Sequence, residues 1–205
     1  MRLPDIADVR GMLGAKSWSL PDLGFGAAGL SAIAVSLIAV PGGGGLLGGG
    51  LALVMIAIAR IDARDLIIPN MLVLAALALG LCHAAAVVPA GMIDGICSAI
   101  IRGAAFALLF FALQVGYCRL RGRDGLGLGD IKLAAAGGTW LDWTTIPVVI
   151  EIATATALTV YLTRALLIQS DELRLTARLP FGLFLAPAIW LGWLLQSLAV
   201  PVGIG

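Results

Sequence analysis

Two aspartates lie where long apolar segments of the chain end. Asp130 closes a Gly127-Leu128-Gly129-Asp130 turn directly before the apolar residues 131–143, and Asp62 directly follows the apolar residues 44–61. Carboxylates are unfavourable in or near hydrocarbon, so two of them at such boundaries indicate a function. Close carboxyls share a proton, which lets one activate water while the other protonates or polarises an amide. The pattern predicts acid–base chemistry at the lipid–water border, with Asp130, as a helix cap, the more readily ionised partner.

The composition predicts a membrane protein without a metal site. The 205 residues are 60% hydrophobic and 12% charged, and the mean hydropathy is +1.05. A soluble domain of this length needs far more polar surface. The net charge of +1 argues against nucleic-acid binding. Because His83 is the single histidine and Cys82, Cys97 and Cys118 are widely spaced, we expect no metal and no cofactor.

The chain is expected to fold as an all-α, polytopic bundle of about seven membrane spans. A span needs about 20 apolar residues, and the segments that fit are 23–40, 44–61, 70–88, 93–117, 131–143, 145–168 and 181–200. Residues 1–22 are expected to form a cytoplasmic or interfacial segment, and residues 23–205 a single membrane domain. The glycine-rich residues 42–50 predict a tight turn with close helix packing, since no Lys-Ser or Lys-Thr follows as in a phosphate loop.

The fifth of these segments is too short for an ordinary span. Its thirteen residues give about 20 Å, against a hydrocarbon core of roughly 30 Å. It is therefore expected to be re-entrant or to begin below the membrane surface, carrying Asp130 inward. Because irregular backbone at that depth must be covered by protein or water, a water-accessible hollow is expected there.

Positive charge predicts the orientation. Twelve of the thirteen Lys and Arg residues fall at one set of segment ends. By the positive-inside rule the N-terminus is expected to be cytoplasmic and the C-terminus periplasmic, which places Asp62 and Asp130 on the cytoplasmic side.

The thirteenth basic residue, Arg102, and the acid Glu151 lie inside two different spans at similar distances from the outer side. Either charge alone would be unfavourable in lipid, so we expect the two to form an ion pair. The alternative is that each side chain extends separately to the outer surface.

Three motifs together resemble the type IV prepilin peptidase family. Asp62 stands seven residues before Pro69 of Ile68-Pro69-Asn70, and Gly127-Leu128-Gly129-Asp130-Ile131-Lys132-Leu133 and Leu179-Pro180-Phe181-Gly182 follow in that order. Members are aspartic proteases of the bacterial inner membrane that cut the basic leader from prepilins and pseudopilins. The resemblance covers about residues 46–200 and implies that Asp62 and Asp130 are the catalytic pair. It implies site-shaping or substrate-binding roles for Gly127, Gly129, Lys132, Pro69, Asn70, Phe181 and Gly182.

One departure from the family bears on activity. Many members carry two Cys-x-x-Cys pairs in a large loop after the first span and also N-methylate the mature pilin, whereas here residues 41–45 join the first two spans and no such pair occurs. The resemblance therefore implies a peptidase without methyltransferase activity. The particular prepilin, pilus or secretion system and the oligomeric state are left open.

Two other readings compete with this one. Presenilin-like intramembrane proteases share the Gly-x-Gly-Asp turn, but they combine it with Tyr-Asp and Pro-Ala-Leu, and here Tyr117 precedes Cys118, Tyr161 precedes Leu162, and no Pro-Ala-Leu occurs. An ion-coupled transporter would place its acids near the bilayer middle and usually shows internal repeats, and neither feature is visible.

Overall fold

The chain folds as a bundle of helices. The computed structural model describes residues 20–87, 91–122, 125–167 and 180–199, so the expected N-terminal segment, up to residue 19, and most of the polar stretch before residue 180 lie outside the described residues. Within them the helices are α2 (Leu20–Ala39), α3 (Gly43–Asp65), α4 (Asn70–Val87), α5 (Met92–Arg121), α6 (Leu128–Gly138), α7 (Thr145–Leu167) and α8 (Gly182–Ala199). The all-α prediction is confirmed, and every helix except α6 begins and ends within about four residues of its predicted segment.

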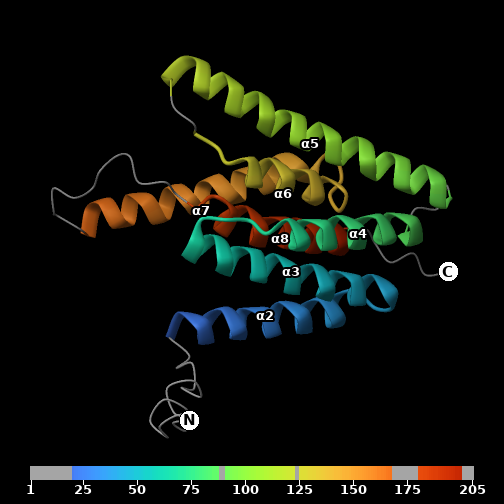
Figure 1. Cartoon of the computed structure of the whole chain (residues 1–205). Helices are drawn as coiled ribbons and strands as arrows, with labels where there is room; N and C mark the ends of the chain where they lie inside the picture. Colours follow the sequence, from blue (N-terminus) through green and yellow to red (C-terminus); the bar gives the residue numbers. More distant parts are fainter. Residues whose placement is uncertain (1–19, 88–90, 123–124, 168–179, 200–205) are drawn as a thin grey trace, which may run out of the picture.

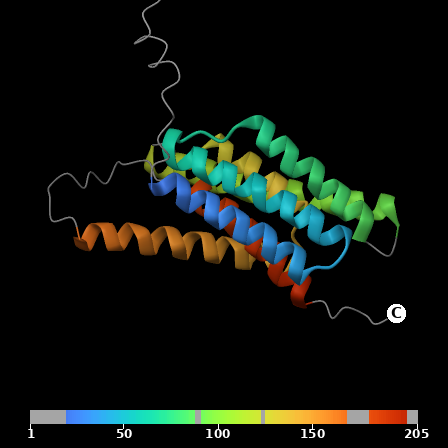
Figure 2. The same ribbon diagram turned by 90° about the horizontal axis from the view of Figure 1, so that it is seen from below.

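The helices surround a core built from α3, α6 and α8. Helix α3 packs against α2, α4 and α8, while α6 packs against α4, α5 and α8. The long helix α5 runs obliquely along one side of the bundle, and α7 lies at its edge, where it packs on α8 (Figures 1 and 2). The largest fully buried side chains come mostly from α3, α5, α8 and the chain near α6, among them Met55, Phe106, Trp140 and Trp193.

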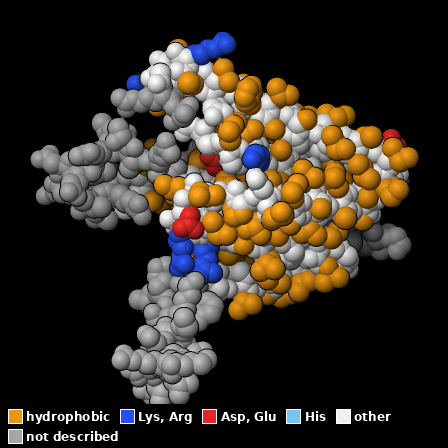
Figure 3. Space-filling model, viewed as in Figure 1, with side chains coloured by type: hydrophobic (Ala, Val, Ile, Leu, Met, Phe, Trp, Pro, Cys, Tyr) orange, Lys and Arg blue, Asp and Glu red, His pale blue; other side chains and the backbone are white. Residues whose placement is uncertain are grey.

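The outer surface is suited to lipid. Four helices among the described residues are long and apolar enough to cross a bilayer: Gly43–Asp65, Met92–Arg121, Thr145–Thr163 and Gly182–Ala199. Helices α2 and α4 contribute shorter apolar stretches. Hydrophobic side chains are spread widely over the face in Figure 3, and few charged side chains are visible among them. Exposing so much apolar surface to water would be unfavourable, so these faces are suited to contact with lipid acyl chains.

Helix α6 differs from its predicted segment. It begins at Leu128 and ends at Gly138, and its eleven residues span only about 16 Å. A Cβ placed on Gly138 would lie 2.7 Å from the Arg102 carbonyl oxygen and from Gly103 Cα of α5, so the two backbones touch there. Beyond the helix end, Trp140 and Leu141 are buried. Helix α6 is therefore a core helix held by its neighbours, and it does not itself cross a membrane.

A tight turn joins α2 and α3, as the glycine-rich residues predict. Gly42 has a φ of +78°, a conformation that residues with a Cβ rarely adopt. Six residues later, a Cβ on Gly48 would collide with the Trp193 ring of α8. The glycines thus reverse the chain and bring α3 close to α8.

The predicted ion pair between Arg102 and Glu151 is not formed. Arg102 Nη1 donates to Ser98 Oγ on its own helix at 3.2 Å, its buried Nε has no partner among the described residues, and Glu151 is exposed on α7. The similar depth of the two residues along their helices does not bring them together, because α5 packs on α4 and α6 while α7 packs on α8. Depth can be read from the distance along a helix, but the choice of neighbouring helix cannot.

Candidate active site

Asp62 lies in the last turn of α3 and points toward the start of α8. Its carboxyl Oδ2 accepts a hydrogen bond from the Leu183 backbone N–H at 2.9 Å, and the residue is only 5% exposed. The chain leaves α3 at Leu66, whose N–H donates to the Asp62 carbonyl oxygen. The carboxyl of Asp62 therefore caps α8, a helix that begins 120 residues later in the chain.

Asp130 occupies the matching position on α6. Its Oδ2 accepts from the Gly127 N–H at 3.2 Å, and its own N–H donates to the Gly127 carbonyl oxygen at 3.1 Å. Asp130 thus supplies the acidic half of a capping box, while the backbone carbonyl of Gly127 accepts in place of an N-cap side chain, and Asp130 is 8% exposed. Each of the two carboxyls thus lies at the N-terminal end of a helix, where the helix dipole favours negative charge.

Ile68 connects the surroundings of the two acids. A Cβ on Gly129, the residue before Asp130, would lie 3.1 Å from Ile68 Cβ. A Cβ on Gly182 would lie 2.8 Å from both Ile68 Cδ1 and Asp62 Oδ2. Ile68 therefore packs against both glycines, and larger residues at either position would push the elements apart. The structure brings Asp62 and Asp130 together at one end of the bundle.

Burial makes Asp130 harder to ionise than its place at a helix cap suggests. The pKa of the Asp130 carboxyl is raised from an ordinary 3.8 to about 6, mainly by burial. The hydrogen bond from the Gly127 N–H lowers this pKa, and the nearby Asp62 carboxyl raises it. The hydrogen bond at the cap is thus outweighed. The contribution of Asp62 indicates that the two carboxyls lie close enough for their charges to repel.

The raised pKa of Asp130 predicts a pH-dependent stability. Between pH 3.8 and about 6 the folded chain holds a proton that the unfolded chain has lost, so the stability contributed by this group is lost as the pH rises through 6. The loss is on the order of 3 kcal/mol. Asp130→Asn keeps the acceptor and removes the ionisation, so its melting temperature should exceed that of the wild type at pH 8 but not at pH 4.

The matched control for this measurement is Asp94→Asn, which changes an exposed acid in the first turn of α5. Its melting temperature should stay close to that of the wild type, because the side chain is exposed. An Asp130→Asn difference that does not grow with pH would contradict the explanation by burial.

The other residues implied by the family motifs line the same end of the bundle. Lys132 Nζ donates to Asn70 Oδ1 at 3.0 Å, so Lys132 joins α6 to α4 and forms no described contact with a carboxylate. The Pro69 carbonyl oxygen accepts from the N–H groups of Leu72 and Val73 and so starts α4. The Phe181 ring packs 6.1 Å from that of Phe110. The N–H of Gly127 donates to the Asp130 carboxyl, and Gly182 leaves room for Ile68 and the Asp62 carboxyl.

Sequence reasoning missed two groups at the site. One is the backbone N–H of Leu183, which binds Asp62, and the other is the side chain of Ile68. Pro180 signals that a helix begins soon after it, so a free N–H near residue 183 could have been expected, but its pairing with Asp62 could not. Ile68 lies inside a quoted motif, yet an apolar side chain carries no chemical signal of its own.

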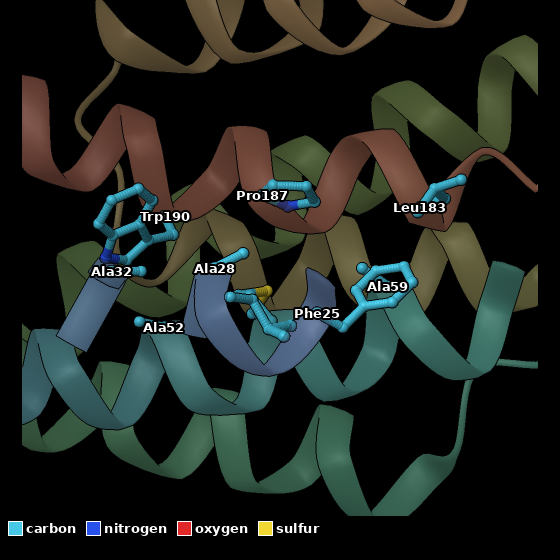
Figure 4. Close-up of a pocket in the computed structure, with 10 residues that line it drawn as sticks. Phe25, Ala28, Ala32, Ala52, Ala59, Leu183, Pro187 and Trp190 are labelled. Atoms are coloured by element: carbon cyan, nitrogen blue, oxygen red, sulfur yellow. The ribbon is translucent and has the colours of Figure 1, made fainter. Parts of the chain in front are cut away.

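An apolar pocket adjoins the site but is not the predicted water-accessible hollow. It encloses about 200 Å³ between α2, α3 and α8 and has an almost wholly apolar lining. Leu183, whose N–H binds Asp62, and Trp190 lie at opposite ends of the lining along α8 (Figure 4). Among the described residues, no group of three or more His, Cys, Asp or Glu side chains could hold a metal ion.

Comparison with known proteins gives a consistent family. The model of the type IV leader peptidase family matches residues 49–162, which include Asp62 and Asp130. The chain is 34% identical over 174 residues to a prepilin leader peptidase/N-methyltransferase of Burkholderia pseudomallei, covering 85% of this chain and 53% of that protein. It is 33% identical over 186 residues to one from Dickeya chrysanthemi, covering 90% and 62%.

A smaller relative also matches. The leader peptidase HopD of Escherichia coli is 33% identical over 133 residues, which cover 64% of this chain and 82% of that protein. The chain spans about half the length of the first of these relatives. No solved structure matches significantly.

Proposed function

Because the chain belongs to the type IV leader peptidase family, we propose that it is an aspartic endopeptidase that removes the leader peptide from type IV prepilins or pseudopilins. One observation carries the proposal: two buried carboxyls, Asp62 on α3 and Asp130 on α6, lie together at one end of a membrane helix bundle. Relatives named as prepilin leader peptidases supply the substrate class.

The chemistry follows from a proton shared by the two acids. The ionised carboxyl takes a proton from a water molecule, whose oxygen bonds to the carbonyl carbon of the scissile amide. The protonated carboxyl donates its proton to the carbonyl oxygen, which gives a tetrahedral intermediate. As the C–N bond breaks, the proton taken from water passes to the leaving nitrogen, and the other carboxyl recovers its proton from a hydroxyl of the intermediate. Burial first, and the nearby Asp62 carboxyl second, raise the pKa of Asp130, which favours a proton on the pair at a pH where isolated aspartates would both be ionised.

The proposed location is the cytoplasmic face of the bacterial inner membrane. Both acids lie near the end of the bundle where α5 ends in Arg119 and Arg121 and α3 ends in Arg60 and Arg64. The positive-inside rule assigns such an end to the cytoplasm. A leader rich in basic residues would reach this end while the apolar part of the substrate stays in the bilayer.

The test is cleavage of a prepilin by the purified chain in liposomes, read by intact mass. The expected product lacks the leader and, with S-adenosylmethionine present, gains no methyl group. A cut inside the apolar segment of the substrate would favour a presenilin-like protease. No cleavage by a folded sample would overturn the proposal, and methylation by the chain alone would overturn the expectation of a single activity.

A further inference from the structure

The segment between α3 and α4 passes the site outside any helix. Residues 67–69 belong to no helix and have negative φ angles, whereas Leu66 before them has a φ of +54°. Two features of the sequence favour an extended backbone here: β-branched Ile67 and Ile68 suit it, and a residue that precedes proline, as Ile68 does, is disfavoured in a helix. The connection is visible between α3 and α4 in Figure 1.

This segment is anchored on one side and open on the other. Ile68 packs against Gly129 and Gly182, which adjoin Asp130 and Leu183. Ile67 is 63% exposed and Leu66 is 51% exposed. Ile68 thus faces the two glycines, whereas the exposed Leu66 and Ile67 side chains face away from them. The anchor fixes the distance between the segment and the two acids.

The backbone of the segment is unpaired. Among the described residues, the N–H and C=O groups of Ile67 and Ile68 form no hydrogen bond, whereas the Pro69 carbonyl accepts two from α4. A row of free backbone groups in extended chain is a template for a second extended chain. The N-terminal ends of α6 and α8 also carry backbone N–H groups without an intrahelical partner, but the two carboxyls accept hydrogen bonds from the N–H groups of Gly127 and Leu183 there.

This inference rests on the proposed function. We propose that residues 66–68, called the edge segment, bind the substrate beside its scissile bond, so that the substrate pairs with the segment as a short second strand. Backbone hydrogen bonds to Ile67 and Ile68 would hold the substrate extended and align its amide with Asp62 and Asp130. A peptide bond inside a helix has its carbonyl and N–H engaged, so an extended substrate is also the form open to attack. Recognition of backbone in this way does not depend on the substrate's side chains next to the cut.

Esters in the substrate test this binding mode without altering the enzyme. One backbone N–H at a time is replaced by an ester oxygen at successive positions on both sides of the scissile bond, which itself stays an amide. In a strand, neighbouring residues direct their N–H groups to opposite edges. Cleavage measured as kcat/KM should therefore fall by about fivefold or more at every second position and change less than about twofold at the positions between.

The positions between serve as matched controls, since each carries the same chemical change on the opposite edge. Equal losses at neighbouring positions, or no loss at any position, would overturn the edge-segment proposal while leaving the peptidase assignment standing. Failure of the enzyme to cut the all-amide parent would overturn the proposed function, and the strand pairing with it.

Discussion

Replacing either Asp62 or Asp130 by asparagine is expected to lower the rate of leader cleavage by about 10²–10⁴-fold. Asparagine has nearly the same shape and retains a side-chain oxygen, so the hydrogen bonds from Leu183 and Gly127 can still form. What is lost is the proton that the two carboxyls share. The measurement is kcat/KM for loss of the leader, read by mass, together with the melting temperature of each variant in the same detergent.

The double variant makes the comparison sharper. If the two carboxyls act as one unit, Asp62→Asn combined with Asp130→Asn should be no slower than the slower single variant. Asp94→Asn, at the opposite end of α5 from the site, should cleave at the wild-type rate. Cleavage within threefold of wild type in either single variant, with the fold intact, would exclude a catalytic role for that aspartate.

Gly182→Ala is expected to lower cleavage by about 10–100-fold although it adds a single methyl group. The new Cβ would lie 2.8 Å from Asp62 Oδ2 and 2.8 Å from Ile68 Cδ1, closer than carbon and oxygen or two carbons can approach. The carboxyl or the isoleucine must then move, and a displacement of about 1 Å at a reacting group can cost on the order of 100-fold. The measurement is again kcat/KM for leader cleavage.

The matched control is Gly116→Ala, a helical glycine of α5 with open space around its Cβ position. It should be as active as wild type and slightly more stable, since alanine is the better helix former. Full activity in a folded Gly182→Ala variant would show that the Asp62 carboxyl need not hold its observed position against α8.

Much of the fold was predictable because its signals are local. Apolar runs bounded by proline, glycine and charged residues indicated six helices to within about four residues at each end. The two acids were also predictable, since a carboxylate at the edge of an apolar segment is unfavourable unless it has a function. Composition alone determined that the chain is a membrane protein and that its outer surface is apolar.

Other features depended on which helices meet, and on which of their faces. The close contact of α6 with α5 at Gly138 was not predictable, and the failure of Arg102 and Glu151 to pair follows from the separate neighbours of α5 and α7. The raised pKa of Asp130 follows from burial, which many residues produce together. Sequence distance and helical period report position along a helix but do not report the direction in which a helix faces. Only the packed structure therefore decided that Ile68, Gly182 and the Leu183 N–H lie around Asp62.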